Sequence, residues 1–325
     1  MNCAITGGLG FVGINLALHL KKQGHKVHLI DNMSRRGTEY NYELAKKYSI
    51  PVYLKGIEDM VDQINLINPD LVYHFAAQVA VTSSYNSPKD DFRVNAAGTF
   101  NIVSSVKCPV IFMSTNKVYG DKVNKVPIVE KDTRYDFDGE LAGNGIPENF
   151  SIDAETHTPY GVSKLVGDLY TREYRGVVNR CSCLYGPNQF GIVDQGWISY
   201  FIMSKLKNRK ITIYGNGKQV RDVLYKDDLV RLLELQAMSI KRIRGQVFNV
   251  GGGYANTISL LELCKLLNIK PSFDEWRPAD QKVYYSDLTK AKKILNWEPK
   301  ITPEEGILKL WKWWKNNINL LKDVI

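Results

Sequence analysis

Short apolar runs alternate with longer amphipathic stretches along the first half of the chain. Runs typical of β-strands cover residues 2–6, 26–30, 51–54, 70–77, 109–114 and 176–185. Stretches with helical periodicity cover residues 11–22, 59–67, 88–106 and 160–175. Apolar strands that alternate with helices are typical of a parallel sheet whose two faces are both covered. The pattern therefore predicts an α/β fold built on a doubly wound parallel sheet.

The alternation weakens at two places, which suggests how the chain is divided. Residues 121–156 contain several glycines and acids and few apolar runs, which indicates an irregular insertion over an active site. Beyond residue 186, the segments GPNQFG, YGNGKQVRDV and WRPADQ are loop-like in composition. We expect a nucleotide-binding domain over 1–185, insertion included, and a smaller C-terminal region over 186–325 that mainly binds substrate. The tryptophans of the WKWWKNN stretch are expected to pack on the body of the protein.

Composition and charge narrow the class of protein. The chain has 325 residues and a net charge of +9, but its basic residues are spread rather than clustered, which disfavours nucleic-acid binding. No apolar run reaches the roughly 20 residues of a membrane span, and the strand-like start MNCAIT does not match a signal peptide. The five cysteines are scattered and complete no metal site. We therefore expect a cytoplasmic protein with reduced thiols and with neither a membrane nor a metal partner.

A glycine-rich loop follows the first predicted strand. Residues 6–13 read TGGLGFVG, and Gly7, Gly10 and Gly13 recur at every third position where the first helix begins. Glycines allow the backbone to approach a pyrophosphate, whose charge is stabilised by the free N–H groups of the helix N-terminus. Because strand, loop and helix follow the order of a Rossmann unit, the segment predicts a dinucleotide site rather than a simple turn.

An acidic residue ends the second predicted strand, about 20 residues after the glycine loop. There Asp31 is placed to accept hydrogen bonds from the adenosine ribose, and its carboxylate would repel a 2′-phosphate. This favours NAD as the cofactor. Arg35 and Arg36 leave NADP open, since an arginine nearby can accommodate the additional phosphate.

A tyrosine and a lysine in the segment YGVSK are candidate catalytic residues. Tyr160 and Lys164 are four residues apart, so they share one face of the predicted helix. An ammonium beside a phenol lowers its pKa from near 10, and the lysine is also suited to hold a nicotinamide ribose. Thr115 ends the fifth predicted strand, at the sheet edge where ligands bind, and its hydroxyl can bond the substrate hydroxyl that loses a proton. Tyr–Lys pairs are common on helix surfaces and Thr commonly caps strands, but their place after a nucleotide loop favours catalysis.

Together these segments resemble the extended short-chain dehydrogenase/reductase family, specifically its nucleotide-sugar epimerases and dehydratases. The resemblance rests on TGGLGFVG, HFAA (74–77), NAAGT (95–99), STNKVYG (114–120) and YGVSK. It continues through GNGKQVRDV (215–223), RPADQ (277–281) and SDLTKAKKILNWEP (286–299), so it covers nearly the whole chain. The fold it implies is a Rossmann-type sheet with a smaller C-terminal substrate-binding region.

The resemblance implies a role for each matching residue. The catalytic hydroxyl, phenol and ammonium fall on Thr115, Tyr160 and Lys164. Contacts to the cofactor fall on Gly7, Gly10, Phe11, Val12, Gly13, Asp31, Asn32, Ser34, Arg35, Phe75, Ala76, Ala77, Asn95, Tyr160 and Lys164. Contacts to the substrate fall on Asn116, Cys183, Asn188, Gln195, Trp197, Arg221, Arg277 and Asp280. Among these, the two arginines are expected to bind a diphosphate and Asp280 to lie near the nucleotide ribose.

Two departures from the family pattern are informative. Family dehydratases carry Asp-Glu directly after the catalytic threonine, to protonate and expel a hydroxyl, whereas this chain has Asn116 and Lys117. Neither residue can act as a carboxylic acid does, which disfavours dehydration and favours epimerisation. The adenine-binding Asp-Ile pair of the family is replaced by the disturbed segment KGIED at 55–59, so adenine recognition stays open.

These observations predict an NAD-dependent epimerase that oxidises a sugar to a keto-sugar and reduces it again on the opposite face. STNKVYG, LYGPNQFGIVDQGW and GNGKQVRDVL resemble the members that invert carbon 2 of a CDP-linked 3,6-dideoxyhexose, so a CDP-sugar is the favoured substrate. A UDP-sugar 4-epimerase and a nucleotide-sugar reductase of the same family are the alternatives. A catalytically idle nucleotide-binding protein is disfavoured by the intact triad. The resemblance also implies a homodimer through paired helices, or a homotetramer.

Overall fold

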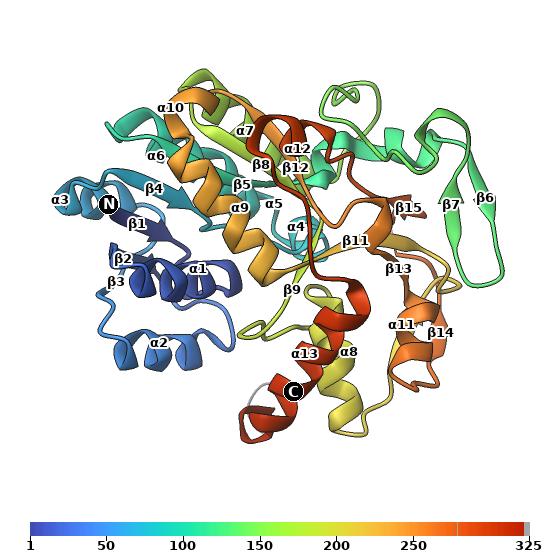
Figure 1. Ribbon diagram of the computed structural model, residues 1–325. Coiled ribbons are helices and arrows are strands. Elements are labelled where there is room, and N and C mark those ends of the chain that lie inside the picture. The colour runs from blue at the N-terminus through green and yellow to red at the C-terminus, as the bar shows by residue number, and fades with distance from the viewer. Residues whose placement is uncertain (278, 322–325) are drawn as a thin grey trace.

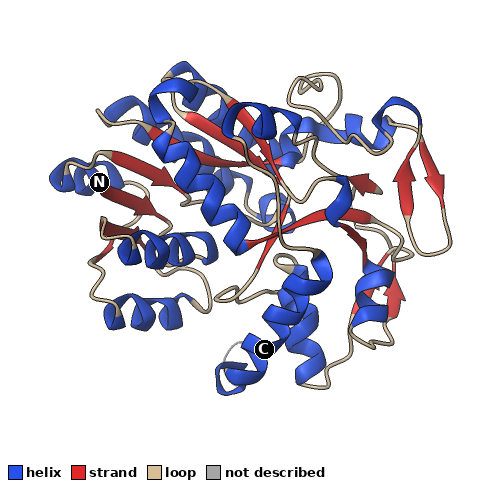
Figure 2. Ribbon diagram, in the orientation of Figure 1, coloured by secondary structure: helices blue, strands red, loops and turns tan. Residues whose placement is uncertain are grey.

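The computed structural model describes residues 1–277 and 279–321, and its centre is a seven-stranded parallel sheet (Figures 1 and 2). The strands, in their spatial order, are β12 (Val247–Val250), β8 (Val177–Cys181), β5 (Val110–Thr115), β4 (Leu71–His74), β1 (Asn2–Thr6), β2 (Lys26–Asp31) and β3 (Val52–Leu54). The chain order reverses between β1 and β4, and in such sheets ligands bind at the carboxyl ends of the strands beside this point. The predicted doubly wound Rossmann-type fold is confirmed.

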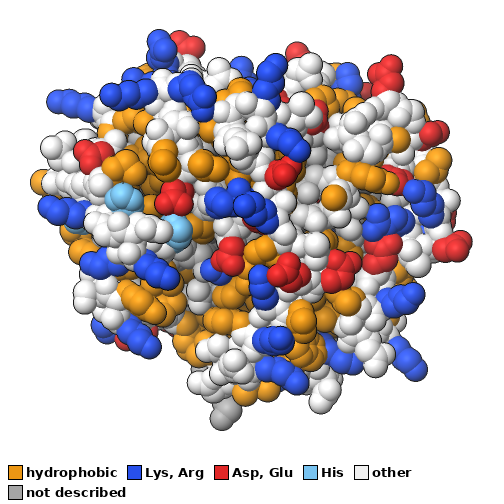
Figure 3. Space-filling model, viewed as in Figure 1, with side chains coloured by type: hydrophobic (Ala, Val, Ile, Leu, Met, Phe, Trp, Pro, Cys, Tyr) orange, Lys and Arg blue, Asp and Glu red, His pale blue; other side chains and the backbone are white. Residues whose placement is uncertain are grey.

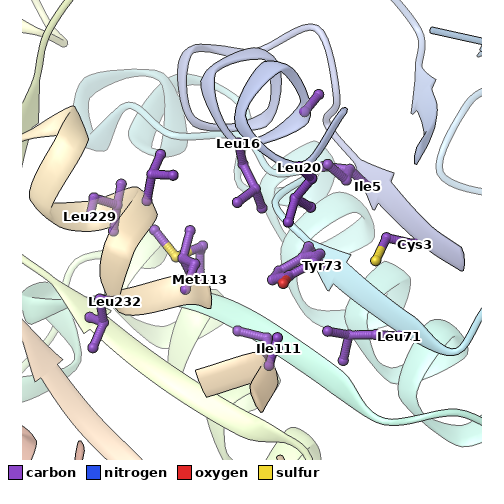
Figure 4. Packing of buried hydrophobic residues seen from close by; sticks show 14 of the residues in the cluster. Cys3, Ile5, Leu16, Leu20, Leu71, Tyr73, Ile111, Met113, Leu229 and Leu232 are labelled. Carbon is purple, nitrogen blue, oxygen red and sulfur yellow. The ribbon is translucent and has the colours of Figure 1, made fainter. Parts of the chain in front are cut away.

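Helices cover both faces of this sheet. One face carries α1 (Phe11–Lys22) and α9 (Lys226–Met238), and the other carries α3 (Met60–Ile67), α6 (Gly98–Ser105) and α7 (Pro159–Glu173). Figure 4 shows the core on the first face, where Leu16 and Leu20 of α1 and Leu229 of α9 belong to one cluster with the sheet residues Tyr73 and Ile111. Because both faces are covered, the central strands are buried along nearly their whole length and are mostly apolar rather than alternating.

The structure corrects several predicted elements of the first half. The helix expected over 88–106 is divided into α5 (Pro88–Asp91), a π-helical turn (Phe92–Ala97) and α6. Helices α2 (Thr38–Lys47) and α4 (Val81–Asn86) lie where the sequence pattern indicated no helix. Both are short and mostly polar, and they fold because they pack on neighbouring elements rather than through an apolar stripe of their own.

The C-terminal half contributes smaller sheets. A four-stranded sheet contains β13 (Thr257–Ser259), β11 (Val220–Tyr225) and β15 (Val283–Tyr284), with β9 (Cys183–Tyr185) also pairing with β11, and β10 (Thr212–Tyr214) pairs with β14 (Ser272–Asp274). The expectation of a loop through YGNGKQVRDV is therefore wrong for β11, whose residues are mostly buried between these strands. The helices of this half are α8 (Trp197–Leu206), α10 (Ile240–Ile243), α11 (Leu260–Leu266), α12 (Thr289–Leu295) and α13 (Pro303–Asn316).

The C-terminal region expected over 186–325 does not form one separate unit. Strand β12 and helix α9 come from beyond residue 186, yet they complete the main sheet and its covering layer. The sequence boundary expected at 185 therefore does not coincide with the edge of the nucleotide-binding half, because the chain returns to the sheet after building β11. The prediction for the terminal tryptophans is confirmed, since Trp314 of α13 is fully buried against α8.

The insertion over 121–156 is largely irregular, as expected. It contains a short hairpin of β6 (Ile128–Glu130) and β7 (Tyr135–Phe137), seen at the right of Figure 1, the end of a 3₁₀ segment at 116–125 and a 3₁₀ turn at 139–141.

On the face shown in Figure 3, lysine and arginine side chains are scattered among acidic ones. Within residues 1–277 and 279–321, no helix has the length and apolar character needed to cross a bilayer.

Candidate active site

The glycine loop between β1 and α1 leaves no room for side chains. Gly7 has a φ of +64°, and a Cβ there would lie 2.7 Å from the backbone nitrogen of Ala76. A Cβ on Gly13 would lie 2.5 Å from the carbonyl oxygen of Gly7. Gly10 precedes α1 without a side-chain cap, so the first N–H groups of the helix face the loop. This close approach of backbone segments is the cradle that a pyrophosphate requires.

Asp31 ends β2 beside this loop and is buried. Its Oδ2 accepts from the N–H of Leu9 at 3.0 Å and its Oδ1 from the N–H of Met33 at 2.8 Å. Burial raises the pKa of the carboxyl, and these backbone donors together with the charge of Arg35 oppose the rise. The Asp31 side chain therefore fixes the glycine loop. The ribose of a bound cofactor would donate to the same two carboxylate oxygens. Asn32 caps the next turn, where its Oδ1 accepts from Ser34 N at 3.1 Å.

Arg35 links the cofactor loop to the C-terminal half. Its guanidinium donates to Gln195 Oε1 at 2.8 Å, and its charge acts on Tyr160 and Asp31. A Cβ on Gly37, where φ is +91°, would meet the ring of Phe190, so this loop packs tightly on the segment before α8. Arg35 thus lies between Gln195, to which it donates, and Tyr160, on which its charge acts.

The catalytic hydroxyls predicted from the sequence lie together at the carboxyl end of β5. Tyr160 occupies the first turn of α7, where Thr158 caps the helix by accepting from Gly161 N at 3.0 Å. The backbone N–H of Tyr160 donates to Ser84 Oγ at 3.1 Å, which fixes the residue from the side of α4. Burial raises the pKa of the Tyr160 hydroxyl, while its hydrogen bond with Thr115 lowers it. The pair is therefore positioned to share a proton with a substrate hydroxyl.

Lys164 lies one turn further along α7 and is buried. Its Nζ is 4.2 Å from the centre of the Phe112 ring. Burial lowers the pKa of Lys164 to about 7, and the charges of Cys181, Asp91 and Asp168 oppose this shift. The ammonium was expected to act on the phenol, but the strongest interaction that lowers the pKa of the phenol in the structure comes from Thr115.

Asn95 lies in the π-helical turn and is completely buried. Its amide donates to Gln78 O at 3.0 Å, Asp91 Oδ1 at 3.1 Å and Ser163 Oγ at 3.2 Å, and it accepts from Gln78 N at 2.9 Å. The residue predicted to contact the cofactor therefore fastens the segment after β4 to α7. Through that segment it positions Phe75, Ala76 and Ala77 next to the glycine loop.

The two arginines predicted to bind a diphosphate occupy separate ion pairs. Arg221 of β11 lies 2.6 Å from Asp280 Oδ1, so the structure brings these two predicted residues together. Arg277 lies 2.9 Å from Asp194 Oδ1 and stacks over the Tyr214 ring at 4.2 Å. Within the RPADQ motif, residue 278 lies outside the described residues.

The remaining predicted substrate residues fall into three groups. Trp197 donates from Nε1 to Cys183 Sγ at 3.4 Å, so these two residues meet. Asn188 has a φ of +66° and donates to Asn15 Oδ1 of α1 at 3.3 Å, which directs it to the nucleotide-binding half. Asn116 donates to Gln281 Oε1 at 3.3 Å.

Sequence reasoning missed several residues that shape this site. Ser84, Asp91, Phe112, Ser163 and Gln281 all contact predicted site residues. Ser163 lies within the recognised YGVSK segment, so its place on the catalytic helix was readable. Gln281 ends the recognised RPADQ segment and Phe112 lies in the predicted fifth strand, so these two were also within readable segments. Ser84 and Asp91 lie in α4 and α5, outside the motifs that were quoted.

Comparison with known proteins relates this geometry to nucleotide-sugar enzymes. The family model described as GDP-mannose 4,6 dehydratase matches residues 4–310. CDP-paratose 2-epimerase of Salmonella typhi is 38% identical over 339 residues, which cover 96% of this chain and 99% of that protein. The crystal structure of UDP-glucose 4-epimerase from Thermotoga maritima with UDP-glucose has a TM-score of 0.80 and 28% identity, covering 98% of this chain and 100% of that chain. The fold is also that of UDP-glucuronic acid 4-epimerase from Bacillus cereus in complex with UDP-glucuronic acid and NAD, with a TM-score of 0.81, 24% identity and 98% and 100% coverage.

Proposed function

This chain belongs to the GDP-mannose 4,6-dehydratase family, and from that membership we propose that it is an NAD-dependent nucleotide-sugar epimerase, specifically a CDP-paratose 2-epimerase. The enzyme is an isomerase that inverts one carbon of the sugar without net oxidation. Two features support the proposal: a dinucleotide cradle beside a Thr–Tyr–Lys triad, and two arginines, Arg221 and Arg277, in the C-terminal half.

The residues of the cradle fit a dinucleotide. At Gly7 and Gly13 any Cβ would occupy space within 3 Å of backbone atoms, so the loop is shaped for close approach to a pyrophosphate. Asp31 places a carboxylate at the end of β2, where it would meet the adenosine ribose and repel a 2′-phosphate. These contacts favour NAD over NADP.

The triad supplies the proton chemistry. NAD, when bound, accepts a hydride from the sugar and returns it. Tyr160 takes the proton of the oxidised hydroxyl and gives it back, and Thr115, whose side chain lowers the pKa of the phenol, is placed to bond the same hydroxyl. Lys164 lies on the same helix face and holds the nicotinamide ribose.

The identity of the two residues after Thr115, Asn116 and Lys117, is the observation that favours epimerisation over dehydration. Asn116 and Lys117 both donate to Gln281 Oε1, at 3.3 Å and 3.2 Å. Neither side chain carries a carboxyl group that could protonate and expel a sugar hydroxyl. The keto-sugar therefore keeps all its substituents and turns over in the pocket, while Arg221 and Arg277 anchor the diphosphate.

The proposal is tested by incubating the purified protein with CDP-, UDP-, GDP- and dTDP-sugars and following the inversion of each carbon by NMR. We expect inversion at carbon 2 of CDP-paratose without added cofactor. Inversion at carbon 4 of a UDP-sugar would replace this assignment with the 4-epimerase alternative, and stoichiometric consumption of reduced cofactor would indicate a reductase.

Isotopic labelling gives a second, independent test. Substrate deuterated at carbon 2 should show a kinetic isotope effect, because hydride leaves that carbon. The label should remain on the sugar, because the same bound cofactor returns it. An isotope effect that appears only with deuterium at carbon 4 would exclude the 2-epimerase.

A further inference from the structure

Lys117 follows the candidate catalytic hydroxyl by two residues, and the mechanism above gives its charge no role. Its backbone N–H donates to Thr115 Oγ1 at 3.2 Å, which fixes the chain where the side chain leaves the end of β5. Its ammonium donates to Gln281 Oε1 at 3.2 Å, and this oxygen also accepts from Asn116. Because Gln281 is buried, it is an anchored partner. The side chain of Lys117 is therefore held at both ends inside the site.

The charges around Lys117 do not balance. Arg221 of β11, the carboxylate of Asp280 and the thiol of Cys183 on β9 all act on its ammonium. The Asp280 carboxylate is already 2.6 Å from the Arg221 guanidinium. Burial raises the pKa of the Cys183 thiol, so this group stays neutral near pH 7. Among the charged groups that act on the Lys117 ammonium, one cation and one carboxylate balance each other, so the ammonium itself has no carboxylate of its own in a partly desolvated site. A further anion would stabilise this arrangement.

A cavity of about 240 Å³ lies beside Lys117 and Gln281, which both line it. Three other ionisable residues line it: Tyr85, Asp121, which accepts from Asn124 at 2.7 Å, and His157, which bonds to Val118 O at 2.9 Å. An ammonium has three N–H donors. Within the described part of the chain, Gln281 is the one hydrogen-bond acceptor of the Lys117 ammonium, so donors remain for a ligand.

We propose that Lys117 binds the diphosphate of the substrate together with Arg221, between Thr115 and the part of the pocket that binds the cytidine of the substrate. The inference rests on the proposed function, because it takes a nucleoside diphosphate as the ligand. The diphosphate supplies the anion that Asp280 alone does not provide, through charge-assisted hydrogen bonds to both cations. It also explains why a lysine stands where a dehydratase needs an acid: the position serves binding rather than elimination.

This contact couples substrate binding to proton uptake. Burial, and next the charge of Arg221, lower the pKa of Lys117 to about 8, so at pH 8 part of the free protein carries a neutral amine. A bound diphosphate favours the ammonium and raises its pKa, so the complex takes up a proton. The affinity for the diphosphate should therefore be full below pH 7 and decline as the pH rises above about 8.

The direct test is calorimetric titration of the NAD-loaded protein with CDP, UDP and CMP. In Lys117→Met we expect the affinity for CDP to fall about 10- to 100-fold, the range for one charge-assisted hydrogen bond, with little change for CMP. Lys117→Arg should restore most of the affinity. Lys125→Met is the matched control, because it removes the same charge from an exposed position of the same segment.

A readout that does not depend on affinity is the proton count at pH 8, measured in two buffers of different ionisation enthalpy. The phosphates of CDP are fully ionised at this pH, since the terminal group has a pKa near 6. The parent should take up a fraction of a proton, and Lys117→Met should take up none. A folded Lys117→Met protein that binds CDP like the parent would overturn the inference alone. A parent that binds neither CDP nor UDP would overturn the proposed function with it.

Discussion

Tyr160 combines a structural contact with a chemical group, and the two can be separated. Its backbone N–H bonds to Ser84 and its ring is buried, and both features survive in Tyr160→Phe. Only the hydroxyl that meets Thr115 is lost. We expect an unchanged melting temperature and NAD content but turnover lower by ~10²–10⁴-fold. Near-normal turnover of this variant, measured by NMR under saturating substrate, would remove Tyr160 from the mechanism.

The two arginines of the C-terminal half should differ in importance. Arg221→Ala leaves the Asp280 carboxylate to offset the charge of Lys117 at the position of the diphosphate, so the net positive charge there is lost together with the contact. Arg277→Ala frees Asp194 in a more exposed pair. Each loss should raise the Michaelis constant by roughly 10- to 100-fold, with the larger effect for Arg221.

Steady-state kinetics and CDP titration would measure these effects. The matched control is Arg244→Ala, because this exposed residue precedes β12 at the opposite edge of the sheet from the site. If both site variants bind CDP as tightly as the parent and the control, the diphosphate binds elsewhere.

At the scale of elements, the turn from β1 into α1 depends on glycine for packing. In Gly13→Ala the new methyl would lie 2.5 Å from the carbonyl oxygen of Gly7, and backbone atoms cannot yield as a flexible side chain does. We expect a lower melting temperature and protein purified without NAD. In Gly56→Ala, a control for stability alone because Gly56 lies in the KGIED segment, the methyl would meet only the end of the Glu58 side chain, so the melting temperature should change little.

The measurements are thermal unfolding and analysis of the nucleotide released on denaturation of each variant. Retention of a full complement of NAD by Gly13→Ala would show that the loop adapts and that its shape does not determine cofactor binding. NADP as the main nucleotide released from the parent protein would contradict the role given to Asp31.

At the scale of the whole molecule, α6 and α7 expose a group of neighbouring apolar side chains. Phe100 is 37% exposed, Leu169 44%, Tyr170 42% and Tyr174 46%, and the Phe100 and Tyr170 rings are 4.7 Å apart. Such a patch marks an interaction surface, and pairing of the same two helices from a second copy would bury it symmetrically. We expect a dimer in solution, as the family resemblance implies.

Light scattering coupled to size-exclusion chromatography would check this expectation. Leu169→Glu should shift the protein toward the monomer, since a buried unpaired carboxylate opposes association. Met238→Glu introduces the same charge at a 76% exposed position of α9 and should leave the dimer intact. A parent protein that is monomeric at micromolar concentration would refute the pairing.

The sequence by itself determined the nucleotide-binding half and the placing of the proposed catalytic residues at the end of β5 and the start of α7. The glycine loop, Asp31, Thr115, Tyr160 and Lys164 are readable because each follows or opens a strand or helix whose period is local. A parallel sheet brings the carboxyl ends of its strands to one edge, so placing these residues along the chain also places them together in space. The helix over 88–106 was readable as helix but not as interrupted by a π-turn, because that turn is fixed by the contacts of Asn95.

Only the tertiary structure decided which side chains meet across the two halves. Lys117 and Gln281 are 164 residues apart, and Arg35 and Gln195 are 160 apart, yet each pair shares a hydrogen bond. No periodicity or motif encodes such a contact, because it depends on how β11 and its neighbours pack against the main sheet. The charge balance of the substrate pocket follows from that packing, so the cation at Lys117 acquires a role in the structure that its position in the chain did not reveal.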